Sequence, residues 1–361
     1  MARLLITGGA GFIGSHTCVL LTEAGHDLIV IDSFVNSSPL ALKGVCEIAK
    51  ITSQSTDRRL KVVKGDVRNK ATLEKIFTEA VKEDRKIDAV IHFAGLKSVH
   101  ESLEKPLKYW DANVSGSCCL LSAMNKYNCR TLIFSSSATI YGAPDSLPIT
   151  EKETITPINP YGNTKAAIEK ILFDLTNMND NWRIASLRYF NPVGAHPSGQ
   201  IGESPLGTPQ NLFPFISQVA SGERKTLKIY GGDWPTADGT CIRDYIHIMD
   251  LAEGHLAAFE YLIQQEEEFI TLNLGTGKGY SVLEVVNSFS KATGMRIDYE
   301  IVGRRDGDTA ETVADPSLAK KILRWETRKS LLDMCCDSWT WQKYSSNIHK
   351  ISTIIPASNI N

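Results

Sequence analysis

A glycine-rich turn near the amino terminus constrains this chain more than any other feature. Residues 3–7 form an apolar, strand-like run that passes directly into Gly8-Gly-Ala-Gly11-Phe-Ile-Gly14, and residues 16–24 then place apolar side chains at helical spacing. In such a turn the glycines let backbone N–H groups approach a pyrophosphate at the positive end of a helix dipole. The motif therefore predicts a dinucleotide site on a βαβ unit, with a plain strand-to-helix turn as the alternative.

An acidic residue follows at a suitable spacing. Asp32 ends the second strand candidate, eighteen residues after Gly14, where a carboxylate can accept hydrogen bonds from an adenosine ribose. Residues 33–38 contain no Lys or Arg to neutralise a 2′-phosphate, and Asp32 would repel one. We therefore expect NAD rather than NADP. A solvated turn residue is the alternative interpretation of Asp32.

The first half of the chain alternates strand and helix patterns. Strand-like runs occur at 3–7, 28–32, 61–65, 89–93, 131–135 and 184–188, and amphipathic stretches occur at 11–24, 71–83, 106–127 and 160–175. This order predicts an α/β fold, a doubly wound, Rossmann-like parallel sheet formed by residues 1–190. Asp66-Val67 and Phe93-Ala-Gly95 would then follow strands at the carboxyl edge, where such sheets bind ligands.

The pattern changes beyond Tyr189. Prolines and glycines recur through residues 192–214 and interrupt regular elements, so we expect a smaller C-terminal lobe, mainly for substrate, in residues 191–344. Segments 249–262 and 282–293 have helix patterns, 269–273 and 297–302 have strand patterns, and some of them are expected to return to the main sheet. Residues 345–361 lack helix signals and are expected to form a mobile tail.

Composition restricts the classes of partner. The 361 residues include 39 basic and 41 acidic side chains, so overall charge attracts neither nucleic acid nor an anionic membrane surface. We find no apolar run of membrane-spanning length and no signal-like segment, and we expect a cytoplasmic protein without membrane contact. The eight cysteines do not have zinc-site spacing, so we expect reduced thiols and no metal.

A serine, a tyrosine and a lysine form the candidate catalytic set. Ser137 follows the fifth strand candidate, and Tyr161 and Lys165 stand at i and i+4 near a helix start, on one helix face. A tyrosine with its reference pKa of about 10 needs a nearby cation to act as a base at neutral pH. Lys165 and the positively charged nicotinamide ring are the natural suppliers of that charge, and Ser137 can align a substrate hydroxyl. A surface helix with a half-buried tyrosine is the alternative.

Taken in order, these motifs resemble the extended short-chain dehydrogenase/reductase family, and more closely its UDP-glucose 4-epimerases. The similarity covers about residues 3–342 and includes the stretches His92-Phe-Ala-Gly-Leu-Lys97, Asn159-Pro-Tyr-Gly162 and Arg243-Asp-Tyr-Ile-His247. It implies reversible interconversion of UDP-glucose and UDP-galactose at C4. Tyr161 would exchange the C4 hydroxyl proton, NAD would serve as hydride carrier, and a transient 4-keto-hexose would rotate before it is reduced again.

The resemblance also implies ligand contacts. With the glycine turn and Asp32, the NAD set comprises Gly8, Gly11, Phe12, Ile13, Gly14, Asp32, Asp66, Val67, Phe93, Ala94, Gly95, Lys97, Asn113, Ser135, Tyr161, Lys165 and Phe190. The UDP-hexose set comprises Ser137, Thr139, Asn191, Asn211, Leu212, Tyr230, Arg243, Arg305, Asp308 and Thr312. Arg243 and Arg305 would face the diphosphate, which suits guanidinium groups. An aspartate follows each arginine, so surface ion pairs are the alternative.

Position 312 bears on the choice of sugar. In these epimerases a gate residue stands there, and a small side chain admits a 2-acetamido group that a large one excludes. Thr312 is small, so UDP-N-acetylhexosamines are expected as further substrates, and UDP-uronates remain an open alternative. The resemblance also implies a homodimer, with helices 106–127 and 160–175 pairing in a four-helix bundle.

Two other functions compete with epimerisation. A nucleotide-sugar 4,6-dehydratase uses an Asp-Glu pair just after the strand-end residue, but Ala138 and Thr139 stand there, so the elimination would lack its acid and base. A non-catalytic NAD-binding scaffold is disfavoured because Ser137, Tyr161 and Lys165 occur together.

Overall fold

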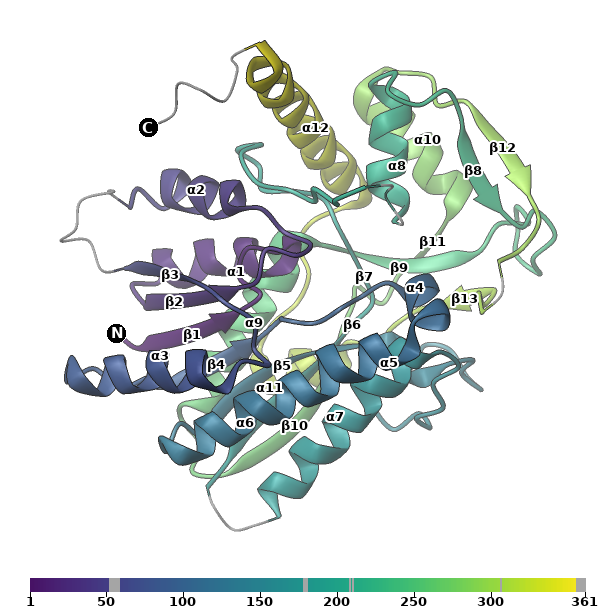
Figure 1. The fold of residues 1–361 in the computed structure, drawn as a ribbon. Helices are drawn as coiled ribbons and strands as arrows, with labels where there is room; N and C mark the ends of the chain where they lie inside the picture. The colour runs from purple at the N-terminus through teal and green to yellow at the C-terminus, as the bar shows by residue number, and fades with distance from the viewer. Residues whose placement is uncertain (52–58, 178–180, 208, 210, 306, 355–361) are drawn as a thin grey trace.

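The computed structural model has a seven-stranded parallel sheet at its centre, in the order β10-β6-β5-β4-β1-β2-β3 (Figure 1). It describes residues 1–51, 59–177, 181–207, 209, 211–305 and 307–354, with backbone only for 348–354. The strands are β1 (Arg3–Thr7), β2 (Asp27–Asp32), β3 (Leu60–Lys64), β4 (Ala89–His92), β5 (Thr131–Ser137), β6 (Arg183–Tyr189) and β10 (Glu268–Leu274). The order reverses at β1, which confirms the doubly wound fold.

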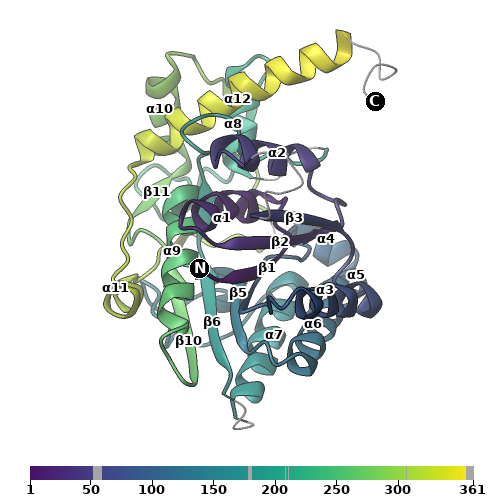
Figure 2. The same cartoon turned by 90° about the vertical axis from the view of Figure 1, so that its left-hand side faces the viewer.

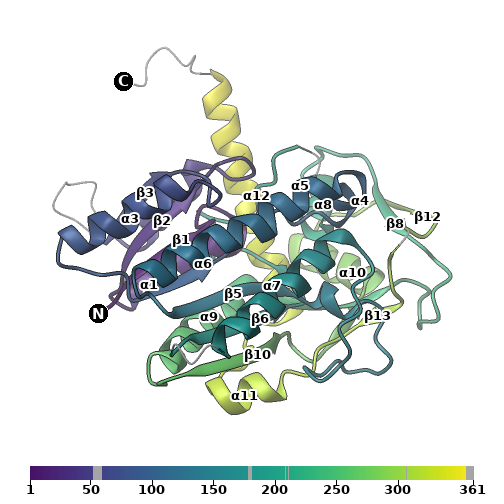
Figure 3. The ribbon, with the colours of Figure 1, turned by 60° about the horizontal axis from the view of Figure 1, so that its bottom comes forward.

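The alternation of side chains along the strands gives this sheet two apolar faces. Leu4 and Ile6 of β1 belong to one buried cluster, whereas Leu5 belongs to the other. The first face is covered by α1 (Phe12–Glu23) and α9 (Ile248–Leu262), and the second by α3 (Lys70–Lys82), α6 (Gly116–Lys126) and α7 (Pro160–Thr176). Figure 2 shows both helix layers, and Figure 3 shows α3, α6 and α7 in front of the sheet. Burial on both faces explains why the inner strands are largely apolar, whereas the edge strand β3 is mostly exposed.

A smaller group of elements lies beyond the carboxyl ends of the strands, at the upper right of Figure 1. Its helices are α8 (Leu212–Ala220), α10 (Val282–Thr293) and α12 (Leu331–Ile354), and its strands are β7 (Asn191–Val193), β8 (Leu227–Tyr230), β9 (Ile242–His247), β11 (Gly279–Ser281), β12 (Tyr299–Val302) and β13 (Glu311–Thr312). Much of this group shares its own buried cluster, which includes Phe213, Val285, Phe289 and Met334. Strand β10 returns from this half of the chain and pairs with β6.

Most predicted elements of the sheet half are present within two residues at each end. The helix predicted for 106–127 is interrupted, because a wider π turn (Trp110–Ser115) separates α5 (Pro106–Tyr109) from α6. The extra residue of such a turn rotates the side chains around it, and Asn113 is bonded there to the backbone of Leu96. Five helices of the described chain were not predicted, namely α2 (Pro39–Ile48), α4 (Val99–Glu104), α8, α11 (Ser317–Leu323) and α12.

We expected a mobile tail from residue 345, but α12 continues to Ile354, so the prediction is wrong for residues 345–354. Its first turns are anchored by buried Met334 and Cys335, and helical hydrogen bonding propagates from such an anchor through polar sequence. Ser346 Oγ also donates to Glu223 Oε1 at 3.0 Å. Residues 355–361 lie outside the described part of the chain. Within the described part, every helix is too short or too polar to cross a membrane.

Candidate active site

The glycine turn between β1 and α1 leaves no room for side chains. Gly8 has a φ of +70°, and a Cβ there would lie 2.7 Å from the backbone nitrogen of Ala94. A Cβ on Gly14 would lie 2.5 Å from the carbonyl oxygen of Gly8. Gly11 caps α1 without a side-chain hydrogen bond, so the N–H groups of the first helical turn, which begins Phe12-Ile13, have no side-chain acceptor at the cap. This cradle fits a pyrophosphate rather than a plain turn.

Asp32 lies beside this turn at the end of β2. Its Oδ2 accepts from the backbone N–H of Ala10 at 2.9 Å, and its Oδ1 accepts from Phe34 N at 2.9 Å and Ser37 Oγ at 2.8 Å. The residue is buried, which argues against a solvated turn residue. The carboxylate is thus fixed next to the glycine turn, where an adenosine ribose would need an acceptor.

The other residues predicted for the cofactor follow the ends of neighbouring strands. Asp66 is bound by Arg68 at 2.6 Å, and that contact holds the pKa of its carboxyl below its usual range. Asn113 is buried, accepts from Leu96 N at 2.7 Å, and donates to Thr164 Oγ1 at 3.0 Å. It therefore ties the loop after β4 to helix α7. Of the remaining residues, Phe93, Ala94 and Gly95 directly follow β4, Phe190 directly follows β6, and Val67 and Phe190 are buried.

The predicted catalytic residues meet where β5 and α7 are in contact. Asn159 begins α7 by accepting from Gly162 N at 2.8 Å, which places Tyr161 in the first turn and Lys165 one turn later. Lys165 is 5% exposed; its Nζ donates to Ser135 O at 2.5 Å and lies 5.9 Å from the centroid of the Tyr161 ring. Ser137 Oγ accepts from Thr139 Oγ1 at 3.0 Å. The buried lysine rules out a solvated surface face for this part of the helix.

Burial shifts the acidity of both groups on this face of α7. It lowers the pKa of Lys165 to about 8, although the carboxylate of Glu169 opposes the shift. It raises the pKa of Tyr161 to about 12, although a hydrogen bond with Ser137 opposes that shift. At pH 7 the lysine is therefore cationic and the phenol protonated. Tyr161 becomes an effective base only when a further positive charge lies nearby.

Two arginines predicted for the diphosphate converge on one carboxylate. Arg243 Nη2 lies 3.9 Å from Asp308 Oδ1, and Arg305 Nε lies 3.0 Å from Asp308 Oδ2. The Arg305 guanidinium also lies 4.6 Å from the ring centroid of Tyr230. Two cations against one anion leave a net positive cluster, which suits a nucleoside diphosphate. Thr312 stands beside Arg243 in the pairing of β13 with β9.

The alternative of ion pairs with the following aspartates is wrong for Arg243. Asp244 is turned away and accepts hydrogen bonds from the backbone of Thr276 and Gly277 at 2.8 and 2.9 Å. Adjacent residues of a strand point to opposite faces, so Arg243 and Asp244 of β9 cannot easily meet. The residue after Arg305, Asp306, lies outside the described residues.

A glutamate that the sequence analysis missed links the two candidate ligand regions. Oε1 of Glu203 accepts from Lys97 Nζ at 3.0 Å and from Asn211 Nδ2 at 2.6 Å. Leu212 begins α8 directly after Asn211, and Asn191 begins β7 beside β9. Glu203 lies in a loop rich in proline and glycine, without a motif that could have identified it.

Comparison with known proteins gives the family. The family model described as NAD dependent epimerase/dehydratase family matches residues 4–275. A UDP-glucose 4-epimerase of Bacillus subtilis is 48% identical over 347 residues, which is 96% of this chain and 98% of the relative. Two crystal structures of UDP-glucose 4-epimerases are also similar. The one from Stenotrophomonas maltophila, with bound NAD and formylated UDP-arabinopyranose, has 45% identity and a TM-score of 0.91, covering 96% of this chain and 100% of that one.

The second structure, from Bifidobacterium longum and in complex with NAD⁺ and UDP, has 46% identity and a TM-score of 0.89, covering 96% of this chain and 99% of that one. These similarities extend over almost the whole length of each protein. They agree with the order of the glycine turn, Asp32 and the Ser137, Tyr161 and Lys165 set along the chain. The chain therefore belongs to the NAD dependent epimerase/dehydratase family and, within it, groups with the UDP-glucose 4-epimerases.

Proposed function

We propose that this enzyme interconverts UDP-glucose and UDP-galactose by NAD-dependent epimerisation at C4 of the hexose. The observation that carries the proposal is the pair of half-buried Tyr161 and buried Lys165 at the carboxyl edge of the sheet that also bears the glycine cradle. The similar structures with NAD and with UDP or a UDP-sugar support the choice of both ligands. In place of the acid and base that a dehydratase needs, Ala138 and Thr139 begin a short 3-10 turn.

Each residue has a role that its surroundings support. When bound, NAD supplies a reversible hydride acceptor for C4 of the sugar. The Tyr161 phenolate, favoured by the charge on Lys165, accepts the C4 hydroxyl proton, and the phenol so formed later returns it. Ser137 holds the C4 hydroxyl of the sugar in line with the Tyr161 hydroxyl group. Arg243 and Arg305 hold the diphosphate, which leaves the 4-keto-hexose free to turn its other face before reduction.

Interconversion without added NAD is the direct test. The purified protein is incubated with UDP-glucose and, separately, with UDP-galactose, and the anomeric signals are followed by proton NMR. The same equilibrium mixture from both sides is expected, since the cofactor is regenerated in each turnover and needs no second substrate. No change in either sample would remove the assignment of these sugars, and uronates would then be tested.

We further propose that the enzyme accepts UDP-N-acetylhexosamines. Thr312 is partly exposed beside Arg243, and its hydroxyl lies 3.0 Å from that of Thr309, so no bulky group fills this position. Thr312→Tyr is expected to lower kcat/KM for the acetylated pair by about tenfold or more through steric exclusion, with a smaller effect on UDP-glucose.

The matched control for this prediction is Thr312→Ser, which keeps the position small and should preserve both activities. Steady-state kinetics with the two sugar pairs measure the ratio of kcat/KM for the acetylated pair to kcat/KM for UDP-glucose and UDP-galactose. Wild-type enzyme that is inactive on the acetylated pair but active on UDP-glucose would contradict the role of Thr312.

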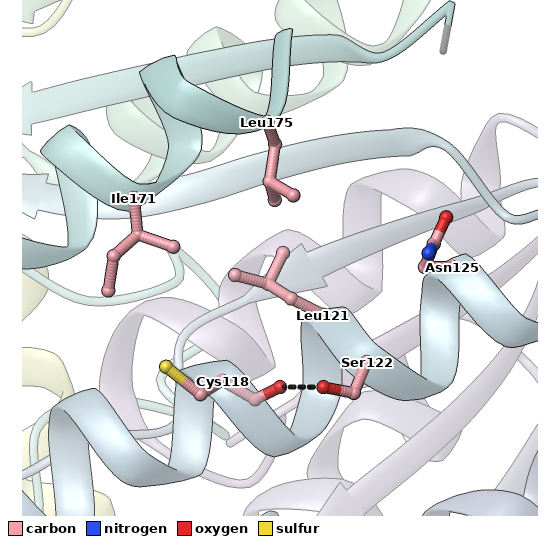
Figure 4. Close-up of a pocket in the computed structure, with 6 residues that line it drawn as sticks. All are labelled: Cys118, Leu121, Ser122, Asn125, Ile171 and Leu175. Atoms are coloured by element: carbon pink, nitrogen blue, oxygen red, sulfur yellow. Dashed lines mark hydrogen bonds between the residues drawn. The ribbon is translucent and has the colours of Figure 1, made fainter. Parts of the chain in front are cut away.

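We propose a homodimer formed by α6 and α7. The face of these helices has a groove of about 210 Å³, lined by Cys118, Leu121, Ser122, Asn125, Ile171 and Leu175 (Figure 4). Apolar side chains are also exposed on the adjoining α5 and on α7, Leu107 at 81% and Phe173 at 45%. A second copy would cover this surface.

Cys118→Arg places a charge in that groove and is expected to raise the dimer dissociation constant by about tenfold or more. Sedimentation velocity measures the change. Cys336→Arg is the control, because Cys336 is also an exposed cysteine but lies on α12. A monomeric wild-type enzyme would refute the dimer.

We propose that residues 1–190 form mainly the NAD-binding domain and residues 191–344 mainly the substrate lobe.

All eight cysteines are free thiols, which supports a cytoplasmic location.

A further inference from the structure

A buried carboxylate lies directly behind the catalytic lysine. Glu169 is one turn beyond Lys165 on α7 and is 4% exposed. Its Oε1 accepts from Ser136 Oγ at 2.6 Å and from Ser186 Oγ at 2.8 Å. These serines lie on β5 and β6, and Ser136 directly follows Ser135, whose carbonyl oxygen binds Lys165. Consecutive residues of β5 therefore hold consecutive turns of α7.

Arg188 of β6 completes the environment of this carboxylate. Its Nε donates to Glu169 Oε1 at 3.1 Å and its Nη2 to Oε2 at 2.7 Å, which is a bidentate pair. Arg188 is 3% exposed. Its Nη1 donates to Tyr141 Oη at 2.9 Å and to Glu151 O at 3.2 Å. Arg188 is thus bonded in four directions and cannot turn away from Glu169.

Glu169 is the carboxylate that offsets the positive charge near Lys165. Lys165 and Arg188 are both buried cations, and Glu169 is the anion between them in the described structure. His92 of β4 also faces Lys165, but burial lowers its pKa to about 3, so it is neutral. Tyr161 is protonated in the free protein. Loss of the Glu169 charge would leave two uncompensated cations in a region of low dielectric constant.

We propose that Glu169, held in place by Arg188, is a positioning residue that keeps Lys165 cationic during turnover and so sets the alkaline end of the working pH range. The proposal rests on the proposed epimerase reaction, with Tyr161 and Lys165 as the proton-transfer pair. The active form of Lys165 is charged, so activity is lost as pH rises through its pKa. Without Glu169 that pKa falls from about 8, and the loss begins at lower pH.

The test compares two variants that separate charge from shape. Glu169→Gln keeps the shape and removes the charge, whereas Glu169→Asp keeps the charge and shortens the side chain. In the pH profile of kcat/KM, Glu169→Gln is expected to shift the alkaline limb to lower pH by about one unit. Above that limb, kcat/KM of the variant should be about tenfold below that of the wild type. Glu169→Asp should lower kcat while its alkaline limb stays near that of the wild type.

A titration that needs no turnover accompanies the kinetics. The Nζ chemical shift of Lys165 is followed against pH by NMR in protein with labelled lysine, and the spectrum of Lys165→Met identifies the signal. Glu169→Gln should lower the pKa of Lys165 read from this signal, because the carboxylate that favours the charged amine is gone. In the double variant Glu169→Gln/Arg188→Met, removal of the second cation should reverse part of this shift and part of the shift in the pH profile.

Glu83→Gln is the control, since Glu83 pairs with buried Arg3 at the amino end of β1, away from the active site. It should change stability and leave the pH profile unaltered. The proposal is overturned if Glu169→Gln lowers activity equally at every pH and leaves the Lys165 titration unmoved. A wild-type enzyme without epimerase activity would instead refute the proposed function.

Discussion

Replacing Tyr161 by phenylalanine is expected to lower kcat by roughly 10²–10⁴-fold, the range for loss of a general acid–base group. The substitution removes only the hydroxyl, and the ring keeps its place in the first turn of α7. Lys165 retains its hydrogen bond to Ser135 O, so the fold and the bound cofactor should remain. Single-turnover measurements with UDP-galactose measure the effect directly.

Tyr299→Phe is the matched control, because the same atom is lost from a half-exposed tyrosine on β12. It should leave kcat unchanged. If Tyr161→Phe kept more than about a tenth of the wild-type rate, another group would have to carry the proton.

Gly14→Ala is expected to abolish tight cofactor binding and to destabilise the protein by about 1–3 kcal/mol, as overpacking does elsewhere. The new Cβ would lie 2.5 Å from Gly8 O and 2.7 Å from Gly9 Cα. Both neighbours are backbone atoms of the turn, so relief requires the turn itself to move. Loss of bound ligand would lower the melting temperature further. Gel filtration followed by measurement of retained NAD tests the prediction.

Gly303→Ala is the control, since no heavy atom lies within 4 Å of its Cβ position in the described structure. Its effect on the free energy of unfolding should stay within about 0.5 kcal/mol. Retention of NAD by Gly14→Ala at the wild-type level would show that the cradle tolerates a methyl group.

The sheet half of the fold was predictable because its signals are local. Five of the six expected strands are buried, and their apolar runs differ clearly from the helix patterns between them. The sixth, β3, is an edge strand with exposed side chains. The glycine turn and Asp32 were recognisable for the same reason, since each lies next to a strand end. Periodicity could not reveal the π turn around Asn113, because one additional residue changes the direction of the side chains without changing the apolar pattern.

The groups that the sequence analysis missed depend on packing between distant elements. Glu169 meets Arg188 only because α7 packs across β5 and β6, and Glu203 meets Lys97 from more than a hundred positions away. The short strands of the substrate lobe pair in a similar way, as when β7 and β13 both join β9. No sequence motif or residue spacing predicts such contacts.

Strand β10 has a consequence for the synthesis of this protein. While the ribosome is adding residues 190–267, β6 is an outer strand whose unpaired backbone groups could join another chain. The sheet gains its last strand only when residues 268–274 emerge and pair with residues 183–189. The cofactor half of the enzyme therefore completes its sheet only after about half of the substrate lobe has been translated. A chain that stops before residue 268 keeps an exposed strand edge that can pair with another chain.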